Sequence, residues 1–248
     1  MLEPKHLNNA PIVEAVIELV VTPPPGFQVQ RFLSLKQRVV KDYPHSNELK
    51  TLVGTIDLKP DGILGAASSP PVVSGYQYWS SDKLFVAQVR PDLFLFSRLK
   101  PYTSWEHFSA EARRFWQEFK AVAAPLSTIK KTGLRFINRL EVPLPAKTTD
   151  YLNCPPKAPD ELNGQITGFL SHIQIHEPES GVGTTIVQFL EPLTKPGVAS
   201  LILDINAFKY EDLEVEDNKI WKNLEMLRGA KNRAFFTSIT EKSYRMFE

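Results

Sequence analysis

Two histidines in the C-terminal half have the spacing that most resembles a metal site. His172 and His176 lie four residues apart in HIQIH, a separation that places two imidazoles on one face of a helix in zinc sites. The segment alternates polar and apolar side chains, which predicts a strand with both histidines on one face. It also lacks the glutamate that directly follows the first histidine in helical zinc proteases. The two histidines are therefore kept only as metal candidates, and we expect no metal and no cofactor.

Other residue types that perform chemistry lack the sequence neighbours they need. Cys154 lies in the stiff stretch NCPP, where no neighbouring cation would activate its thiol. The chain has neither a G-x-S-x-G serine elbow nor a G-x-x-x-x-G-K-[ST] phosphate loop. Gly181 and Gly183 in ESGVGTT precede the β-rich run TIVQFL, so we expect a hairpin turn rather than a nucleotide-binding loop. No catalytic residue is predicted.

Acidic residues that are distant in sequence leave a hydrolytic function open. Active-site groups converge only in the folded chain, so a hydrolase or nuclease site could combine Glu14, Glu18, Asp57 and Asp204 with the histidines. For Asp204 a simpler expectation is that it caps a loop after the apolar run LIL, together with Asn206.

Two β-rich runs carry matching pairs of opposite charge. Glu14 and Glu18 lie four residues apart on one strand, and Arg135 and Arg139 do the same on another. If the two strands are neighbours, carboxylate–guanidinium pairs would help to set their register. We therefore expect these residues to be close together. The alternative is that both pairs face water.

Asn138 is the most conspicuous polar residue in an otherwise apolar stripe. It alternates in register with Leu134, Phe136, Leu140 and Val142, which predicts that its amide is buried. A buried amide without partners destabilises a fold by about 1–3 kcal/mol. The interpretations are a hydrogen bond to the backbone of a neighbouring loop, or contact with a ligand in a cleft.

Aromatic residues on one predicted strand suggest a second kind of binding. In GYQYW, Tyr76 and Tyr78 share a strand face and could stack on unpaired bases of RNA or single-stranded DNA. The charge balance opposes this interpretation, because 29 basic and 28 acidic residues leave a net charge of +1. The short basic cluster of Arg228, Lys231 and Arg233 is expected to be a solvated helix face.

The composition is that of an ordinary folded protein. The chain has 248 residues, 42% of them hydrophobic and 23% charged, and a single cysteine that cannot form an internal disulfide. The first residues lack the basic start and apolar core of a secretory signal, and no apolar run reaches the roughly 20 residues that cross a bilayer. We expect a cytoplasmic protein without membrane contact.

The elements that would position these residues recur in two similar sets. The first set is expected to have a strand at 12–21, a helix from 27 to 43, strands between 52 and 99, and a helix that starts with a capping box at Thr103 and Glu106. The second is expected to have strands at 133–142, 172–177, 184–191 and 199–206, with helices at 161–170 and 220–239. The offset between the sets is about 120 residues, which favours internal duplication.

We therefore predict an α+β fold of two similar halves. Each half would contain a strand, a helix, antiparallel strands and a long amphipathic helix, and the halves would share or abut sheets. The expected boundaries are 1–125 and 126–248, packed as one compact unit. In this arrangement the first strands of the two halves would meet in the middle of one sheet.

Several separated blocks resemble a sporadically distributed family of uncharacterised bacterial proteins about 250 residues long. The blocks are APIVEAVIEL, PYTSWEHF and GLRFINRLEVP, together with the closing LRGAKNRAFFTSIT. The residues that match are Pro11, Glu14, Pro101, Tyr102, Trp105, Trp116, Gly133, Arg135 and Asn138. The resemblance implies no activity, but a patchy distribution is typical of genes that move between genomes, including toxin–antitoxin and anti-phage defence cassettes.

The sequence thus favours a non-enzymatic binding or adaptor module over an enzyme. Its partner would be a protein, or a small ligand held in a groove, and it could pair with a second copy through an exposed sheet edge. The alternatives are an RNA or single-stranded DNA binding protein and a hydrolase or nuclease. The binding candidates are Glu14, Glu18, Arg135, Asn138, Arg139, Tyr76 and Tyr78.

Overall fold

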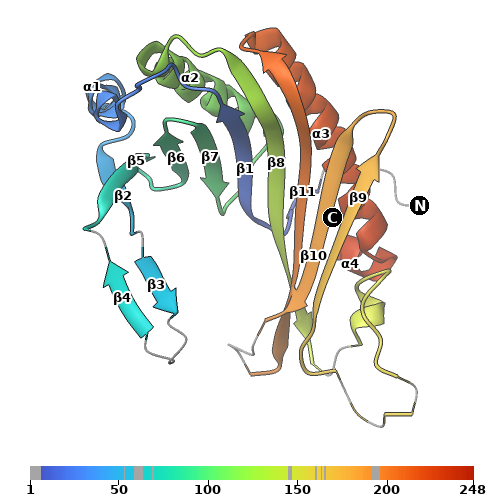
Figure 1. Ribbon diagram of the computed structural model, residues 1–248. Helices are drawn as coiled ribbons and strands as arrows, with labels where there is room; N and C mark the ends of the chain where they lie inside the picture. The colour runs from blue at the N-terminus through green and yellow to red at the C-terminus, as the bar shows by residue number, and fades with distance from the viewer. Residues whose placement is uncertain are drawn as a thin grey trace.

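A single antiparallel sheet of nine strands organises the chain (Figure 1). The computed structural model describes residues 7–52, 54–58, 64–68, 70–144, 147–159, 161–162, 164, 166–191 and 196–248. The strands lie in the order β2-β5-β6-β7-β1-β8-β11-β10-β9, and a separate hairpin pairs β3 with β4. The strands are β1 (Ile12–Val21), β2 (His45–Thr51), β3 (Gly54–Leu58), β4 (Leu64–Ser68), β5 (Val72–Trp79), β6 (Phe85–Arg90), β7 (Leu93–Leu99), β8 (Thr128–Pro143), β9 (Leu170–Glu177), β10 (Val182–Leu190) and β11 (Val198–Glu214).

The predicted α+β fold of two similar helix–strand halves is wrong. The chain is mainly β, because strand residues outnumber helical residues and the nine strands form one sheet. The helix expected at 161–170 is absent from the described residues of that range, and Leu170 already begins β9. Strand β11 runs on to Glu214 where a loop was expected after residue 206. Strand β2 lies before the region 52–99 in which strands were predicted.

The first strands of the two predicted sets do lie side by side in the middle of the sheet. Strands β1 and β8 pair antiparallel, with Ala15 opposite Phe136 and Ile17 opposite Leu134. This prediction is confirmed. The alternation of both strands explains the pairing, since each presents one mainly apolar face to the core. The β1–β8 pair therefore joins the strands that come before and after the expected boundary at residues 125 and 126 into one sheet.

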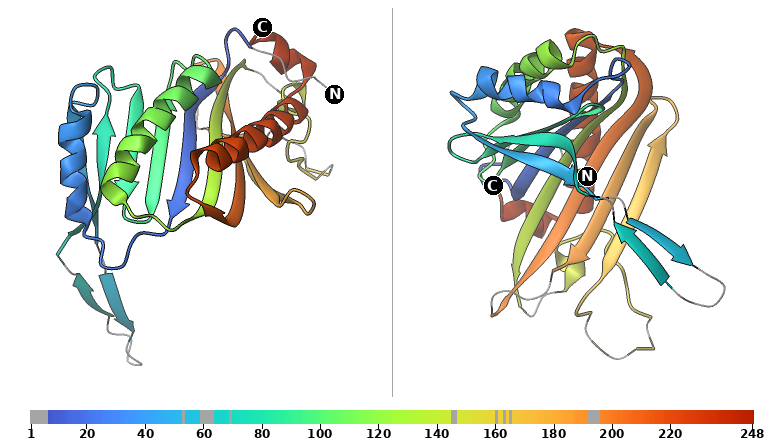
Figure 2. Two further views of the ribbon diagram at one scale, coloured as in Figure 1. Left: turned by 90° about the horizontal axis from the view of Figure 1, so that it is seen from above. Right: turned by 60° about the vertical axis from the view of Figure 1, so that its left-hand side comes forward.

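Helices cover one face of the sheet, and the described residues place none on the other (Figure 2). The long helices are α2 (Trp105–Ala123) and α3 (Asp217–Ser238), and the short ones are α1 (Leu33–Val39), α4 (Glu241–Arg245) and the 3₁₀ turns η1 (Val29–Phe32) and η2 (Thr148–Asp150). No described helix has the length and apolar character to cross a membrane. We call the uncovered side of the sheet the open face.

Aromatic side chains fill the space between α2 and the sheet. Phe115 and Phe119 of α2 pack against Phe94 of β7, with ring centroids 6.4 and 5.4 Å apart. Burying each such side chain contributes about 1.5–3 kcal/mol. Helix α2 begins after Ser104, whose Oγ accepts from the backbone N–H of His107 at 3.2 Å. Ser104, rather than the expected Thr103, is therefore the N-cap of α2.

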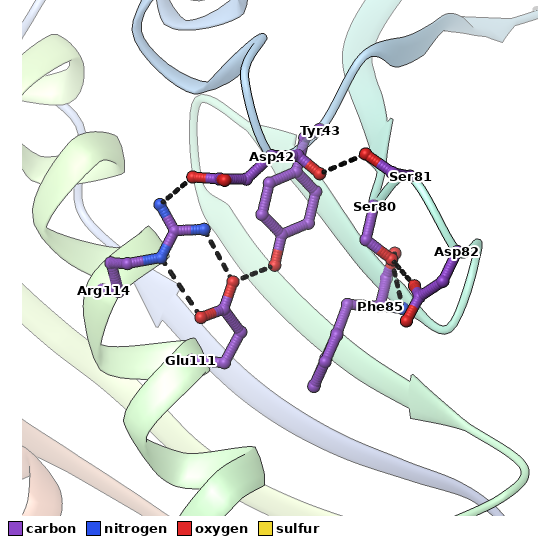
Figure 3. A network of polar contacts seen from close by, with 8 residues as sticks. All are labelled: Asp42, Tyr43, Ser80, Ser81, Asp82, Phe85, Glu111 and Arg114. Carbon is purple, nitrogen blue, oxygen red and sulfur yellow. Dashed lines mark hydrogen bonds and ion pairs between the residues drawn. The ribbon is translucent and has the colours of Figure 1, made fainter.

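A polar network fixes α2 to the segment that follows α1 (Figure 3). The Tyr43 hydroxyl donates to Glu111 Oε1 at 2.7 Å, and Arg114 forms ion pairs with both Glu111 and Asp42. Burial opposes ionisation of Glu111, but the hydrogen bonds from Arg114 and Tyr43 outweigh it and lower the pKa of this carboxyl group. The network locks the end of α1 onto the helix layer.

Candidate ligand pocket

A pocket lies on the helix-covered side of the sheet, between the start of α2, the second half of α3 and strand β8. Its volume is about 390 Å³, in the range of small-molecule sites. We call it the Lys231 pocket. It is lined by Leu7, Ala10, Pro11, Ile12, Tyr102, Thr103, Ser104, Trp105, Glu106, Phe136, Asn138, Arg228, Lys231, Asn232, Phe235 and Phe236.

A buried lysine is the most unusual group in this pocket. Lys231 follows Leu227 by four residues and precedes Phe235 by four, so it belongs to the stripe of α3 that faces the sheet. Only 8% of the residue is exposed. Its Nζ lies 3.7 Å from the centroid of the Phe136 ring, a cation–π distance. Within the described part of the chain, its ammonium group has no hydrogen-bond or ion-pair partner.

The environment of Lys231 changes its ionisation. Burial, with a smaller effect from the positive charge of Arg228, lowers the pKa of the Lys231 ammonium to about 7. Near neutral pH the group is therefore divided between its charged and neutral forms. A buried amine in this state responds strongly to any anion that enters the pocket, because the anion would favour the charged form.

Asn138 places an amide on the wall of the same pocket. It is 2% exposed, and its Nδ2 donates to the backbone carbonyls of Leu203 at 2.9 Å and Phe136 at 3.3 Å. These partners are strand carbonyls rather than the loop expected from the sequence. Among the described residues nothing donates to Asn138 Oδ1. Its position follows from the alternation of β8, which turns Asn138 to the same side as Phe136.

A break in the pairing of β1 and β8 lies beside Asn138. Ile12 is opposite Asn138 and Glu14 is opposite Ile137, so the register shifts between Ile12 and Glu14. Such a bulge bends a strand and redirects its side chains. Here it lies where residues 10–12 turn into β1 and line the pocket. The start of β1 therefore forms part of the pocket wall.

Charged groups surround the mouth of the pocket. Arg228 forms ion pairs with Glu225 at 3.3 Å and with Glu106 at 3.8 Å, and its guanidinium lies 5.5 Å from the centroid of the Trp105 ring. Tyr102 is half-buried at the other side, and burial raises the pKa of its hydroxyl. The Arg228 charge is thus largely offset by two carboxylates, whereas that of Lys231 is not.

The predicted acidic and basic pairs lie together on the open face, but with other partners. Arg135 forms a two-bond ion pair with Asp204 at 2.5 and 2.8 Å, and Arg139 pairs with Glu191. The register explains this, because Val16 rather than Glu14 or Glu18 is opposite Arg135. The Asp204 hydrogen bond, followed by the charges of Asp204, Glu14 and Glu18, raises the pKa of Arg135 despite its burial. Their proximity is confirmed, and their expected pairing is corrected.

Glu18 finds its own partner on the neighbouring strand. Its carboxylate accepts from Lys131 Nζ at 2.5 Å. Gly133 stands opposite Glu18, and a Cβ atom there would lie 2.9 Å from Glu18 Oε2. The missing side chain of Gly133 therefore leaves the space that the Glu18 carboxylate occupies. Asp204, once expected to cap a loop, instead lies inside β11, where it is buried beside Arg135.

The tyrosines expected to stack on bases are not accessible. Tyr76 and Tyr78 are 5% and 1% exposed on the helix-covered face of β5, and Tyr78 donates its hydroxyl proton to the Phe32 carbonyl at 2.7 Å. Burial raises the pKa of both hydroxyl groups. The prediction of base stacking by these residues is corrected, because α1 and α2 pack over the strand face that carries them.

The histidines and remaining acidic candidates do not form a metal cluster within the described residues. His172 and His176 are exposed on the open face of the end strand β9, as the alternation predicted. No group of three or more histidine, cysteine, aspartate or glutamate side chains in the described ranges is placed to hold a metal ion. The side chain of Asp57 lies outside the described residues. Gly181, with φ of +69°, is in the hairpin turn expected between β9 and β10.

Sequence reasoning found Asn138 but missed Lys231. The basic cluster of Arg228, Lys231 and Arg233 was expected to face water, yet Lys231 is buried. Its spacing from Leu227 and Phe235 was the available signal. Several residues that carry the family resemblance also line the pocket, namely Pro11, Tyr102, Trp105 and Asn138.

Comparison with known proteins does not identify the protein. No protein-family model matches the chain, and no curated protein sequence matches it significantly. The resemblance to a family of bacterial proteins therefore stays a prediction.

Proposed function

We propose that the protein is a non-enzymatic binding module that holds a small ligand in the Lys231 pocket. The observation that carries this proposal is the pairing of two buried polar side chains, Lys231 and Asn138, that line one pocket without full use of their hydrogen-bonding groups. Both groups can therefore form further hydrogen bonds with a ligand that enters the pocket. These bonds would give the ligand a favourable interaction that a purely apolar pocket does not offer.

The walls of the pocket support the same function. Phe136, Phe235 and Phe236 provide apolar surface, while the polar groups lie at a few defined positions. This combination is typical of sites that bind small organic molecules, because apolar area supplies affinity and the polar groups select the ligand.

The test is recovery of the ligand with the protein. The full chain is purified from its native host and denatured, and released small molecules are identified by mass spectrometry. A variant Asn232→Phe fills the pocket from α3, since Asn232 lines it and makes no hydrogen bond within the described residues. We expect wild type to release a compound that Asn232→Phe retains at less than about a tenth of that amount, a loss of about 1.4 kcal/mol or more of binding free energy.

Asn218→Phe is the matched control, because Asn218 is an exposed asparagine at the other end of α3. It should release the same compound as wild type. Equal recovery from wild type and Asn232→Phe, with both proteins folded by circular dichroism, would contradict the proposed site.

A second candidate function is an adaptor that receives a strand from a protein partner. Strand β9 is an end strand of the sheet, and its Ile173 and Ile175 are 40% and 46% exposed. An apolar edge strand of this kind is a natural template for strand addition. A role in a mobile defence or toxin–antitoxin cassette is a prediction of the family resemblance alone.

A further inference from the structure

We infer that the ligand of the Lys231 pocket is a small organic acid, with an apolar body of about the size of an aromatic ring and a single carboxylate that binds the Lys231 ammonium. This inference rests on the proposed function and names the class of ligand that the same site selects. It follows from the arrangement of apolar walls, the Lys231 cation, with which no described residue pairs, and nearby carboxylates.

The apolar body is indicated by the lining residues. Phe136 lies against Lys231, Phe235 and Phe236 of α3 also line the pocket, and Leu7 and Ile12 add apolar surface to it. A volume of about 390 Å³ admits a ring with a short side chain and excludes larger cofactors such as dinucleotides. Removing a ring from water against these side chains supplies most of the affinity.

The acidic group is indicated by Lys231. An ammonium that is 8% exposed and has no anionic partner among the described residues is destabilised by loss of hydration. A carboxylate at hydrogen-bond distance would replace that hydration with a charge-assisted bond. The aromatic face of Phe136 holds the ammonium from the opposite side but leaves its N–H donors available.

A single charge is indicated by the groups that face Lys231. On α3 the nearest is Arg228, which already forms ion pairs with Glu225 and Glu106. Glu106 of α2 and the hydroxyl of Tyr102 line the pocket as well. A monoanion balances Lys231, whereas a phosphate dianion would bring an excess negative charge against Glu106. A carboxylate is therefore favoured over a phosphate ester.

The ionisation of Lys231 makes the binding of an acid depend on pH. Burial and then Arg228 hold the pKa of the free ammonium at about 7. An anion binds the charged form, so the pKa of Lys231 rises in the complex. Affinity is full below pH 7 and falls about tenfold for each pH unit above it, up to the raised pKa of the complex. A neutral ligand has no such dependence on this group.

Three matched probes test the inference by isothermal titration calorimetry on the full chain. They are 3-phenylpropionate, its neutral analogue 3-phenylpropanamide, and phenyl phosphate. At pH 6 we expect the acid to bind at least tenfold more tightly than the amide. Its affinity should fall about tenfold between pH 6 and pH 8, while that of the amide stays constant. At pH 8, where phenyl phosphate is almost entirely a dianion, we expect the acid to bind more tightly than the phosphate ester.

Lys231→Met, which keeps the length and removes the charge, should weaken binding of the acid at least tenfold and leave the amide unaffected. Lys222→Met is the control, because Lys222 is an exposed lysine of the same helix. If Lys231→Met does not fold, the comparison of acid with amide and the pH profile of wild type still decide the matter.

The outcomes separate the inference from the proposed function. Equal binding of acid and amide, or no dependence on pH, would overturn the assignment of an organic acid while leaving a ligand pocket in place. Tighter binding of phenyl phosphate than of the acid at pH 8, where the ester is a dianion, would overturn the assignment of a singly charged ligand. Absence of heat with all three probes would overturn the inference, whereas the proposed function would fail only if Asn232→Phe also retained the compounds that wild type carries.

Discussion

The Nζ atom of Lys231 lies 3.7 Å from the centroid of the Phe136 ring, so a cation from α3 rests on an aromatic side chain of the central strand β8. This contact joins the helix layer to the middle of the sheet at the pocket wall. It partly compensates the buried charge. The compensation is incomplete, because the pKa of Lys231 is still lowered to about 7.

Stability should therefore depend on the ionisation of Lys231. In the folded chain its pKa is about 7, below the value of about 10.4 for an exposed lysine. The unfolded chain binds the extra proton between these values, so the free energy of unfolding rises with pH from about 7 to about 10 through this group. We expect a rise of a few kcal/mol, with about 5 as the upper bound for a shift of this size.

The measurement is the difference in urea denaturation between wild type and Lys231→Met at pH 6.5, 8 and 9.5. Other ionisable groups cancel in that difference. Lys231→Met should be the more stable protein at pH 6.5, and its advantage should shrink as pH rises. A difference that does not change with pH would show that Lys231 keeps an ordinary pKa in the folded chain.

Asn138 should contribute to stability through its two backbone hydrogen bonds. Asn138→Leu removes the donors to Leu203 and Phe136 but keeps a side chain of similar volume. We expect a loss of about 1–3 kcal/mol in the free energy of unfolding, measured by urea denaturation. Asn206→Leu on the open face is the comparison, because Asn206 donates no side-chain hydrogen bond within the described residues, and it should cost under about 0.5 kcal/mol. Equal losses of unfolding free energy in the two variants would show that the Asn138 hydrogen bonds do not stabilise the fold.

The strands that the sequence predicts well are those whose pattern is local. Strand β7 spans 93–99 and β1 spans 12–21, as alternation and the flanking prolines or turn residues predict. Strand β2 has the sequence HSNELKT, and five of its seven residues are exposed, so no apolar alternation marked it. It becomes a strand because it pairs with β5. Its formation is a tertiary effect that residue patterns do not contain.

The pocket could be predicted only in part. Asn138 was identifiable because it interrupts an apolar stripe, and its strand neighbours set its direction. The pocket itself combines residues 7–12, 102–106, 136–138 and 228–236, which meet only after the sheet and α3 are assembled. Lys231 was assigned to a solvated face as part of a short basic cluster, and lysine is in general rarely buried without a partner. That rule fails most often at functional sites, where an unfavourable group is retained for binding.

The ion pair between Arg135 and Asp204 should be worth more than an ordinary surface pair. Asp204 has a side chain that is 12% exposed and accepts two hydrogen bonds from one guanidinium, while Arg135 remains 49% exposed. We expect a coupling free energy of about 0.5–1 kcal/mol in a double-mutant cycle of Arg135→Gln and Asp204→Asn. The cycle is measured by urea denaturation. The exposed pair of Lys242 and Asp150 is the control and should give a smaller coupling. A coupling free energy near zero in both cycles would show that the Arg135–Asp204 pair is worth no more than an exposed ion pair.

Because β9 is an exposed end strand of the sheet, we expect the protein to self-associate through it. An antiparallel pair of two copies centred on Gln174 would place Ile173 of one copy opposite Ile175 of the other, on the face where both are exposed. We expect sedimentation velocity to show a monomer–dimer equilibrium that shifts toward monomer in Ile175→Lys. A lysine on an edge strand opposes pairing because its charge would have to leave water. Leu33→Lys on α1 is the control, since Leu33 is also exposed, at 52%, but lies on a helix. Monomeric wild type at all concentrations, or a dimer that Ile175→Lys leaves intact, would contradict pairing through β9.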